Sequence, residues 1–144
     1  MKRVFAAFLF FVLAITLNAD SVKENVWGSD LKKAVQSAKK QKKKAVMLFF
    51  TAPGWCGPCR RLESETMPSA GFQKLAKKAE LVKMDFSERN KVTSDMRKTA
   101  QDFKIQGFPT LIVLDPSGKE KGRIVGYRPE KNYLSELEKL VKTK

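Results

Sequence analysis

The sequence predicts an α/β fold, in which a central mixed β-sheet carries helices on both faces. Short apolar runs rich in β-branched and aromatic residues alternate along the 144-residue chain with longer segments of helical periodicity. That alternation is typical of strands joined by helices. Near the C-terminus, two strand-like runs are separated only by a short turn, which predicts an antiparallel hairpin. The sheet should therefore contain strands of both directions.

The first half of the chain supplies a helix, a buried strand and a second helix. Ser29 suits the N-cap of a helix that runs to about Lys43, because its hydroxyl can accept a hydrogen bond from a free backbone N–H group. Residues 45–50 form a continuous apolar run of strand length. Residues 51–54, Thr-Ala-Pro-Gly, favour a turn, and a helical pattern begins at Cys59.

The second half repeats the alternation and ends on the hairpin. Residues 80–86 are predicted to form a strand parallel to the first, and a helix should run from residue 89 or 90 to about residue 104. Residues 110–114 form the next strand, followed by an Asp-Pro-Ser-Gly turn and a strand over residues 122–127. Pro129 suits the first position of the last helix. One apolar face of that helix is formed by Leu134, Leu137, Leu140 and Val141.

The only two cysteines of the chain, Cys56 and Cys59, lie where the first strand meets a helix. Free N–H groups and the helix dipole stabilise a thiolate at such a position, and Arg60 and Arg61 add positive charge. The pKa of the attacking thiol should therefore lie below its usual value. We expect Cys56 to be exposed and to attack substrate disulfides. Cys59, one turn further along, should be the buried partner that resolves the mixed disulfide.

Other uses of two cysteines fit this chain less well. A structural disulfide between them would close a very small ring and remove little entropy from the unfolded chain. A structural zinc site needs four ligands, and the sequence offers two cysteines and no histidine. The absence of histidine also excludes a cysteine nucleophile with an imidazole base. We expect no metal and no organic cofactor, only a redox-active disulfide.

Residues 55–59, Trp-Cys-Gly-Pro-Cys, resemble the redox signature of the thioredoxin family. Residues 105–114 resemble the segment in which that family opens a central strand with a cis-proline beside the active site, and Pro109 is the matching proline. The resemblance covers about residues 29–142 and implies the thioredoxin fold. It also implies a substrate groove lined by Trp55, Gly57, Pro58, Phe108 and Pro109.

The chain departs from the family pattern near the second cysteine. Many thioredoxins carry a buried aspartate in the strand before the signature, where it helps to move a proton, whereas this chain has Phe49 or Phe50 in that region. The candidate acceptors for the Cys59 proton are solvent and Glu63, which lies one turn beyond Cys59. Alternatively, Glu63 is a surface helix residue with no role in the reaction. The approach through Pro-Gly to Trp55 is also one residue longer, as in exported thioredoxin-like proteins.

The dipeptide between the cysteines bears on the direction of the reaction. The resemblance implies a reductase, because reducing members carry Gly-Pro here, whereas strongly oxidising members usually carry a histidine that stabilises the reduced form. A disulfide oxidase or isomerase and a redox-inert binding module with the same fold are the alternatives. A reductase needs an electron donor, which we expect to be a membrane protein.

The N-terminal residues predict export. Residues 1–19 have the order of a secretory signal peptide, with two basic residues, an apolar run and a small residue before the cleavage point. Residues 20–28 would then be a lead-in segment and residues 29–144 one domain. The predicted location is the periplasm. An inner-membrane anchor formed by residues 4–17 is the alternative, although this run is shorter than the roughly 20 residues of a spanning helix.

The charge of the chain is strongly positive. Lysine and arginine number 29 against 15 acidic residues, a formal net charge of +14 at pH 7. The lysine runs at helical spacing are most simply solvated faces, with attraction to an anionic membrane surface or to acidic substrates as alternatives. These runs lack the interleaved aromatic residues that bind nucleic acids. We expect a monomer that acts on disulfide-containing envelope proteins and binds no nucleic acid.

Overall fold

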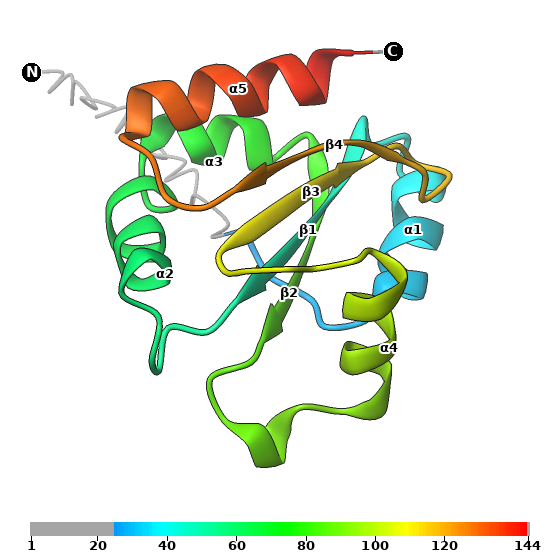
Figure 1. The fold of residues 1–144 in the computed structure, drawn as a ribbon. Helices are drawn as coiled ribbons and strands as arrows, with labels where there is room; N and C mark the ends of the chain where they lie inside the picture. Colours follow the sequence, from blue (N-terminus) through cyan, green and yellow to red (C-terminus); the bar gives the residue numbers. More distant parts are fainter. Residues whose placement is uncertain (1–24, 144) are drawn as a thin grey trace, which may run out of the picture.

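The computed structural model of the protein describes residues 25–143. Its four strands form one sheet in the order β2-β1-β3-β4 (Figure 1). The sheet is mixed, because β1 pairs with β2 in parallel, whereas β3 is antiparallel to both β1 and β4. This arrangement confirms the predicted fold class. The strands are β1 (Ala45–Thr51), β2 (Ala79–Asp85), β3 (Thr110–Leu114) and β4 (Glu120–Val125).

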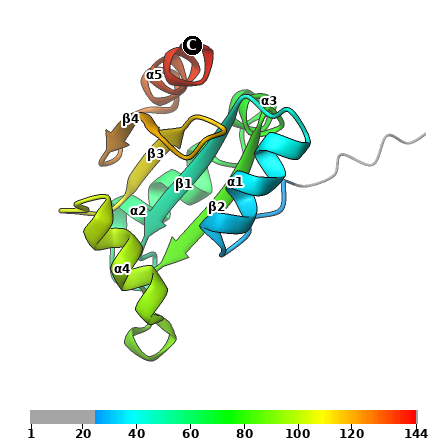
Figure 2. The same ribbon diagram turned by 90° about the vertical axis from the view of Figure 1, so that its right-hand side faces the viewer.

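Helices cover both faces of the sheet (Figures 1 and 2). The helical segments are α1 (Leu31–Lys40), α2 (Gly57–Arg61), the π-helical turn η1 (Leu62–Thr66), α3 (Ala70–Ala76), the 3-10 turn η2 (Arg89–Lys91), α4 (Ser94–Asp102) and α5 (Glu130–Lys142). Met47 and Phe49 of β1 pack on the face covered by η1, α3 and α5, whereas Leu48 and Phe50 pack on the face covered by α1 and α4. All seven residues of β1 are buried, which explains its continuous apolar run.

The first helix is shorter than predicted and has a different cap. Asp30 rather than Ser29 is the N-cap of α1, and its carboxylate accepts a hydrogen bond of 3.0 Å from a backbone N–H group of the first turn. The helix ends at Lys40 instead of near Lys43. Lys42 has a φ of 53°, a left-handed conformation that an α-helix does not continue through.

The prediction of a single helix between residues 89 and 104 is wrong. The chain forms the η2 turn, leaves helical geometry at Val92 and starts α4 at Ser94. The hydroxyl of Thr93 accepts a hydrogen bond from the Met96 N–H group at 3.1 Å and so defines the start of α4. Side-chain capping at Thr93 therefore divides a stretch whose periodicity alone is continuous.

The hairpin and the last helix are confirmed with small shifts. Strand β4 ends at Val125, so Tyr127 lies beyond the strand that was predicted to contain it. Pro129 is the N-cap of α5 and not its first helical residue. Leu137 and Val141 of the predicted apolar face are buried, and Tyr133, which was not predicted, is buried with them.

The predicted signal segment, residues 1–19, lies outside the described residues, as does most of the lead-in over residues 20–28. The described part of the lead-in lies against the sheet, because Gly28 forms a parallel bridge with Val82 of β2. Trp27 packs on Phe49 with ring centroids 5.7 Å apart. Within residues 25–143, no helix is both long enough and apolar enough to cross a membrane.

Candidate redox site

Cys56 and Cys59 lie at the start of α2, just after the C-terminal end of β1, and a disulfide joins them. Cys56 is the N-cap of α2, and its sulfur accepts a hydrogen bond of 3.2 Å from the backbone N–H group of Cys59. The helix begins at Gly57, two residues earlier than predicted. Pro58 occupies the first turn, where its missing N–H group removes no hydrogen bond within the helix. Both sulfurs therefore lie at a helix N-terminus.

The two cysteines differ in their exposure to solvent. Cys56 is 8% exposed, whereas Cys59 is completely buried. Ala52, Phe86 and Phe108 pack against the pair. The prediction that Cys56 is exposed is wrong, because these three residues leave only this small fraction open. Cys59 is the more deeply buried of the two, as predicted.

Aromatic side chains lie beside Cys56. Trp55 is 60% exposed, and its indole N–H group donates a hydrogen bond of 3.2 Å to the carbonyl oxygen of Phe86. The Trp55 ring meets Phe108 edge to face, with ring centroids 5.7 Å apart. The carbonyl oxygen of Phe108 lies 3.7 Å from the Cys56 sulfur. Trp55 and Phe108 thus form an apolar surface beside the Cys56 sulfur. The edge-to-face ring contact and the indole hydrogen bond hold Trp55 in place.

The predicted proline lies beside this aromatic surface. The peptide bond between Phe108 and Pro109 is cis, as predicted, and β3 begins at the next residue, Thr110. The Pro109 carbonyl oxygen accepts a hydrogen bond of 2.8 Å from the Gly126 N–H group. Pro109 itself is buried and lines neither of the grooves beside Phe108, although it was predicted as a substrate-binding residue. The start of a strand tolerates its missing N–H group.

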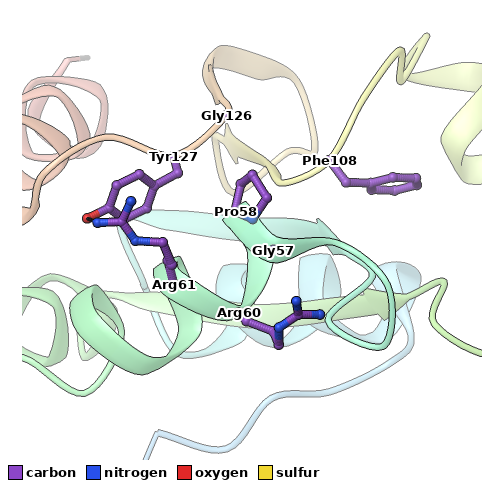
Figure 3. A pocket seen from close by; sticks show the side chains of 7 residues that line it. All are labelled: Gly57, Pro58, Arg60, Arg61, Phe108, Gly126 and Tyr127. Atoms are coloured by element: carbon purple, nitrogen blue, oxygen red, sulfur yellow. Dashed lines mark hydrogen bonds between the residues drawn. The ribbon is translucent and has the colours of Figure 1, made fainter.

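A groove of about 660 Å³, which we call the Pro58 groove, opens at the start of α2. Figure 3 shows the residues that line it. Gly57, Pro58 and Phe108, all predicted as substrate-binding residues, line it together with Gly126 and Tyr127 from the segment after β4. Arg60 and Arg61 of α2 complete the lining. The segment after β4 was not predicted as part of the site, because no sequence motif marks it.

Arg61, Glu65 and Tyr127 bind one another at the rim of the Pro58 groove. The Arg61 guanidinium lies 4.2 Å from the centre of the Tyr127 ring and donates hydrogen bonds to Glu65 and to the Tyr127 hydroxyl. The Tyr127 hydroxyl donates to the Glu65 carboxylate at 2.5 Å. Hydrogen bonds from Tyr127 and Arg61 lower the pKa of Glu65, and the carboxylate raises the pKa of Tyr127. These contacts join α2 and η1 to the segment after β4.

Glu63 is held in place and is not the plain surface residue of the alternative prediction. Its side chain is 21% exposed and pairs with Lys83 of β2, whose side chain is 29% exposed. The hydroxyl of Thr51 donates a second hydrogen bond, of 2.6 Å, to the same carboxylate. Phe49 lies opposite Lys83 in the sheet, and its side chain packs on the face covered by η1. Of the two phenylalanines, Phe49 is thus the one on the Glu63 side.

Comparison with known proteins places the chain in a family. The pattern described as "Thioredoxin-like domain" matches residues 31–141. The "Disulfide bond reductase DsbH" of Chlamydia pneumoniae is 32% identical over 95 residues, which cover 62% of this chain and 57% of that protein. The "Thiol:disulfide interchange protein DsbD" of Campylobacter jejuni is 34% identical over 95 residues, but the match spans only 16% of its length. "Thioredoxin H1" of Arabidopsis thaliana is 34% identical over 107 residues, 72% of this chain and 76% of that protein.

Solved structures share the fold. The structure of a "DsbH Oxidoreductase" superposes with a TM-score of 0.66 at 26% identity, covering 83% of this chain and 85% of that one. A thioredoxin from Thermus thermophilus gives a TM-score of 0.66 at 21% identity, covering 82% and 88%. The chain therefore belongs to the thioredoxin-like family, and it carries the Cys-x-x-Cys pair of a thiol–disulfide oxidoreductase.

Proposed function

We propose that this protein reduces protein disulfides through Cys56 and Cys59. The position of Cys56 carries the proposal. It caps a helix, and its sulfur accepts a hydrogen bond from the N–H group of Cys59. It retains a small exposed fraction, 8%, whereas Cys59 has none, and the Pro58 groove opens at the start of the same helix. That combination suits a thiolate nucleophile that attacks a disulfide of a protein substrate.

In the first step the Cys56 thiolate attacks one sulfur of a substrate disulfide. The substrate S–S bond breaks, its electron pair leaves with the other sulfur as a thiolate, and a mixed disulfide forms at Cys56. The Cys59 N–H group, 3.2 Å from the Cys56 sulfur, and the helix dipole stabilise the attacking thiolate before the bond forms. The substrate chain binds in the Pro58 groove against Gly57, Pro58 and Phe108, with Trp55 packed on Phe108 and the buried Pro109 next to it in the chain.

In the second step Cys59 loses its proton and attacks the Cys56 sulfur. The Cys56–Cys59 disulfide forms, the second substrate sulfur leaves as a thiolate, and the substrate has gained two electrons. We assign Glu63 as the proton acceptor, since it lies one turn beyond Cys59 and is held by Thr51 and Lys83. One fifth of its side chain is exposed, so it can pass the proton on to solvent.

The direction of the reaction follows from Gly57 and Pro58. The whole sequence contains no histidine, so no imidazolium can stabilise the reduced form as it does in strong oxidants. The relative named as a disulfide bond reductase supports this direction. Disulfide oxidation or isomerisation is the alternative, and a redox-inert binding module is the third candidate. The oxidised pair must then be reduced again by another dithiol protein, for which we propose a membrane electron donor.

Insulin reduction and substrate trapping test the proposal together. The wild-type protein should reduce insulin when a chemical donor is supplied, whereas a redox-inert module would leave insulin intact. Cys59→Ser should hold substrates as stable mixed disulfides through Cys56, and the matched variant Cys56→Ser should trap few, because Cys59 is buried. Trapping mainly through Cys59 would overturn the assignment of roles.

We propose, finally, that the protein acts in the cell envelope as a monomeric domain over residues 29–144. The support is the order of basic, apolar and small residues in residues 1–19, which suits a cleaved signal peptide. Cell fractionation followed by N-terminal sequencing should find a soluble envelope protein that begins near Asp20. Recovery only from membranes, with residues 4–17 retained, would favour the anchor instead.

A further inference from the structure

A second groove opens on the other side of Phe108 from the Pro58 groove. This hollow of about 490 Å³, which we call the Trp55 groove, is lined by Trp55, Phe86, Ser87, Val92 and Phe108 and by two arginines. Phe108 lines both this groove and the Pro58 groove, and its carbonyl oxygen lies 3.7 Å from the Cys56 sulfur. A substrate chain bound across Phe108 would therefore extend toward both grooves.

Each groove contains arginine without a carboxylate partner. Arg60 lines the Pro58 groove, whereas Arg89 of η2 and Arg97 of α4 line the Trp55 groove. All three are exposed, and in the described part of the chain none of them forms an ion pair. Arg60 donates one hydrogen bond, of 2.9 Å, to the Pro53 carbonyl oxygen, which leaves its charge uncompensated.

Three carboxylates in these segments have other partners. Glu88 pairs with Lys91 at 2.7 Å, and Glu65 binds Arg61 and Tyr127. Asp85 accepts a hydrogen bond of 2.8 Å from the Ser87 N–H group. None of these carboxylates lines either groove, and no other acidic residue between positions 25 and 143 does so. Both sides of the reactive cysteine are thus positively charged.

We propose that the protein selects disulfides that lie in acidic segments, with carboxylates of the substrate bound by Arg60 on one side of Cys56 and by Arg89 and Arg97 on the other. The inference rests on the proposed thiol–disulfide exchange and names its substrate class. A guanidinium suits this role, because its planar donors match a carboxylate in a bidentate pair.

These arginines act on the substrate at short range, and the lysine-rich part of the chain is too far from the grooves to replace them. The lysine-rich end of α1 lies before β1 in the chain, whereas the cysteines lie just after it. The lysines and the cysteines are therefore at opposite ends of a seven-residue strand, which is about 23 Å long. That length exceeds the Debye length of about 8–10 Å at physiological ionic strength. The three arginines, which line the grooves themselves, therefore determine which flanking residues are accepted.

The test uses three fluorogenic disulfide peptides that differ only in the residues beside the cysteines, which are glutamate, glutamine or lysine. The reduced protein is mixed with each peptide, and the second-order rate constant of a single turnover is measured. Exposed ion pairs change an equilibrium by about 1.4- to 5-fold each, so we expect the acidic peptide to react about fivefold faster than the neutral one at low salt. The lysine peptide should react slowest, and the three rate constants should converge at 1 M salt.

Two matched variants separate local recognition from overall charge. Arg89→Gln with Arg97→Gln should reduce the preference for the acidic over the neutral peptide to below twofold. Lys39→Gln with Lys40→Gln removes the same charge at the far end of the molecule and should leave that preference unchanged. Equal losses in both variants, or equal rates for all three peptides in the wild type, would overturn the inference alone. A wild-type protein that reduces no peptide would contradict the proposed function as well.

Discussion

Replacing Glu63 with glutamine should destabilise the folded protein, because it leaves the ammonium of Lys83 without an anion. The Glu63 carboxylate also accepts a hydrogen bond of 2.6 Å from the Thr51 hydroxyl. The side chains of Glu63 and Lys83 are only 21% and 29% exposed, respectively. A hydrogen bond to a charged group contributes about 1.5–3 kcal/mol, and partial exposure reduces that contribution. We therefore expect Glu63→Gln to lower the free energy of unfolding by about 1–2 kcal/mol.

Urea unfolding of the oxidised protein at pH 7 measures this loss, and a double-mutant cycle with Lys83→Met isolates the pair. The coupling energy between positions 63 and 83 should be about 1 kcal/mol. Lys98 and Asp102 offer a matched control at 2.9 Å, with side chains 72% and 57% exposed. Asp102→Asn should cost less than about 0.5 kcal/mol, because solvent screens that pair.

A coupling energy below about 0.3 kcal/mol between Glu63 and Lys83 would refute this reasoning, since the pair would then behave like the exposed control. The same substitution also tests the assigned proton transfer. Glu63→Gln should lengthen the lifetime of the mixed disulfide at Cys56 and change its pH dependence, whereas a merely structural role would leave both unchanged. These two measurements separate the proposed proton transfer by Glu63 from its contribution to stability.

The Tyr133 hydroxyl is buried without a hydrogen-bond partner among residues 25–143, so Tyr133→Phe should leave the free energy of unfolding unchanged or raise it by up to about 1 kcal/mol; a clear loss would reveal a partner. Tyr127→Phe removes the hydroxyl that lowers the pKa of Glu65, so NMR titration should show this pKa rising toward its usual value. In the wild type the stabilisation by Glu65 is present above the unfolded-state pKa and disappears as the pH falls through the lowered one. Pro58→His should make the cysteine pair more oxidising, by about 30 mV for each 1.4 kcal/mol that the reduced form gains, and an unchanged potential would refute this.

Most of the fold could be predicted from the sequence, because the strands are determined by burial. The β1 run is apolar throughout since both faces of the strand are covered, and this signal is visible in one sequence. Helix ends were less predictable, because they depend on which of several polar residues provides the cap. Ser29 and Asp30 are adjacent candidates, and Thr93 interrupts a stretch of continuous periodicity.

The centre of the candidate site could also be predicted, since its residues form two short motifs around Cys56 and Pro109. The contacts that hold this centre could not be predicted. Glu63 and Lys83 are 20 residues apart, and Glu65 and Tyr127 are 62 residues apart. Periodicity reports which face a residue occupies, but it does not report which distant residue lies opposite. The sheet register and the path of the chain after β4 bring these partners together.

The equilibrium reduction potential of the Cys56–Cys59 pair distinguishes a reductase from an oxidase most directly. The protein would be equilibrated with dithiothreitol or glutathione at pH 7, and its reduced fraction followed by thiol alkylation. A reductase with a Gly-Pro dipeptide and no histidine should have a potential nearer to about −270 mV, the value of thioredoxin, than to about −120 mV, that of a strong oxidant. A potential near −120 mV would contradict the reductase assignment and leave oxidation or isomerisation as the function.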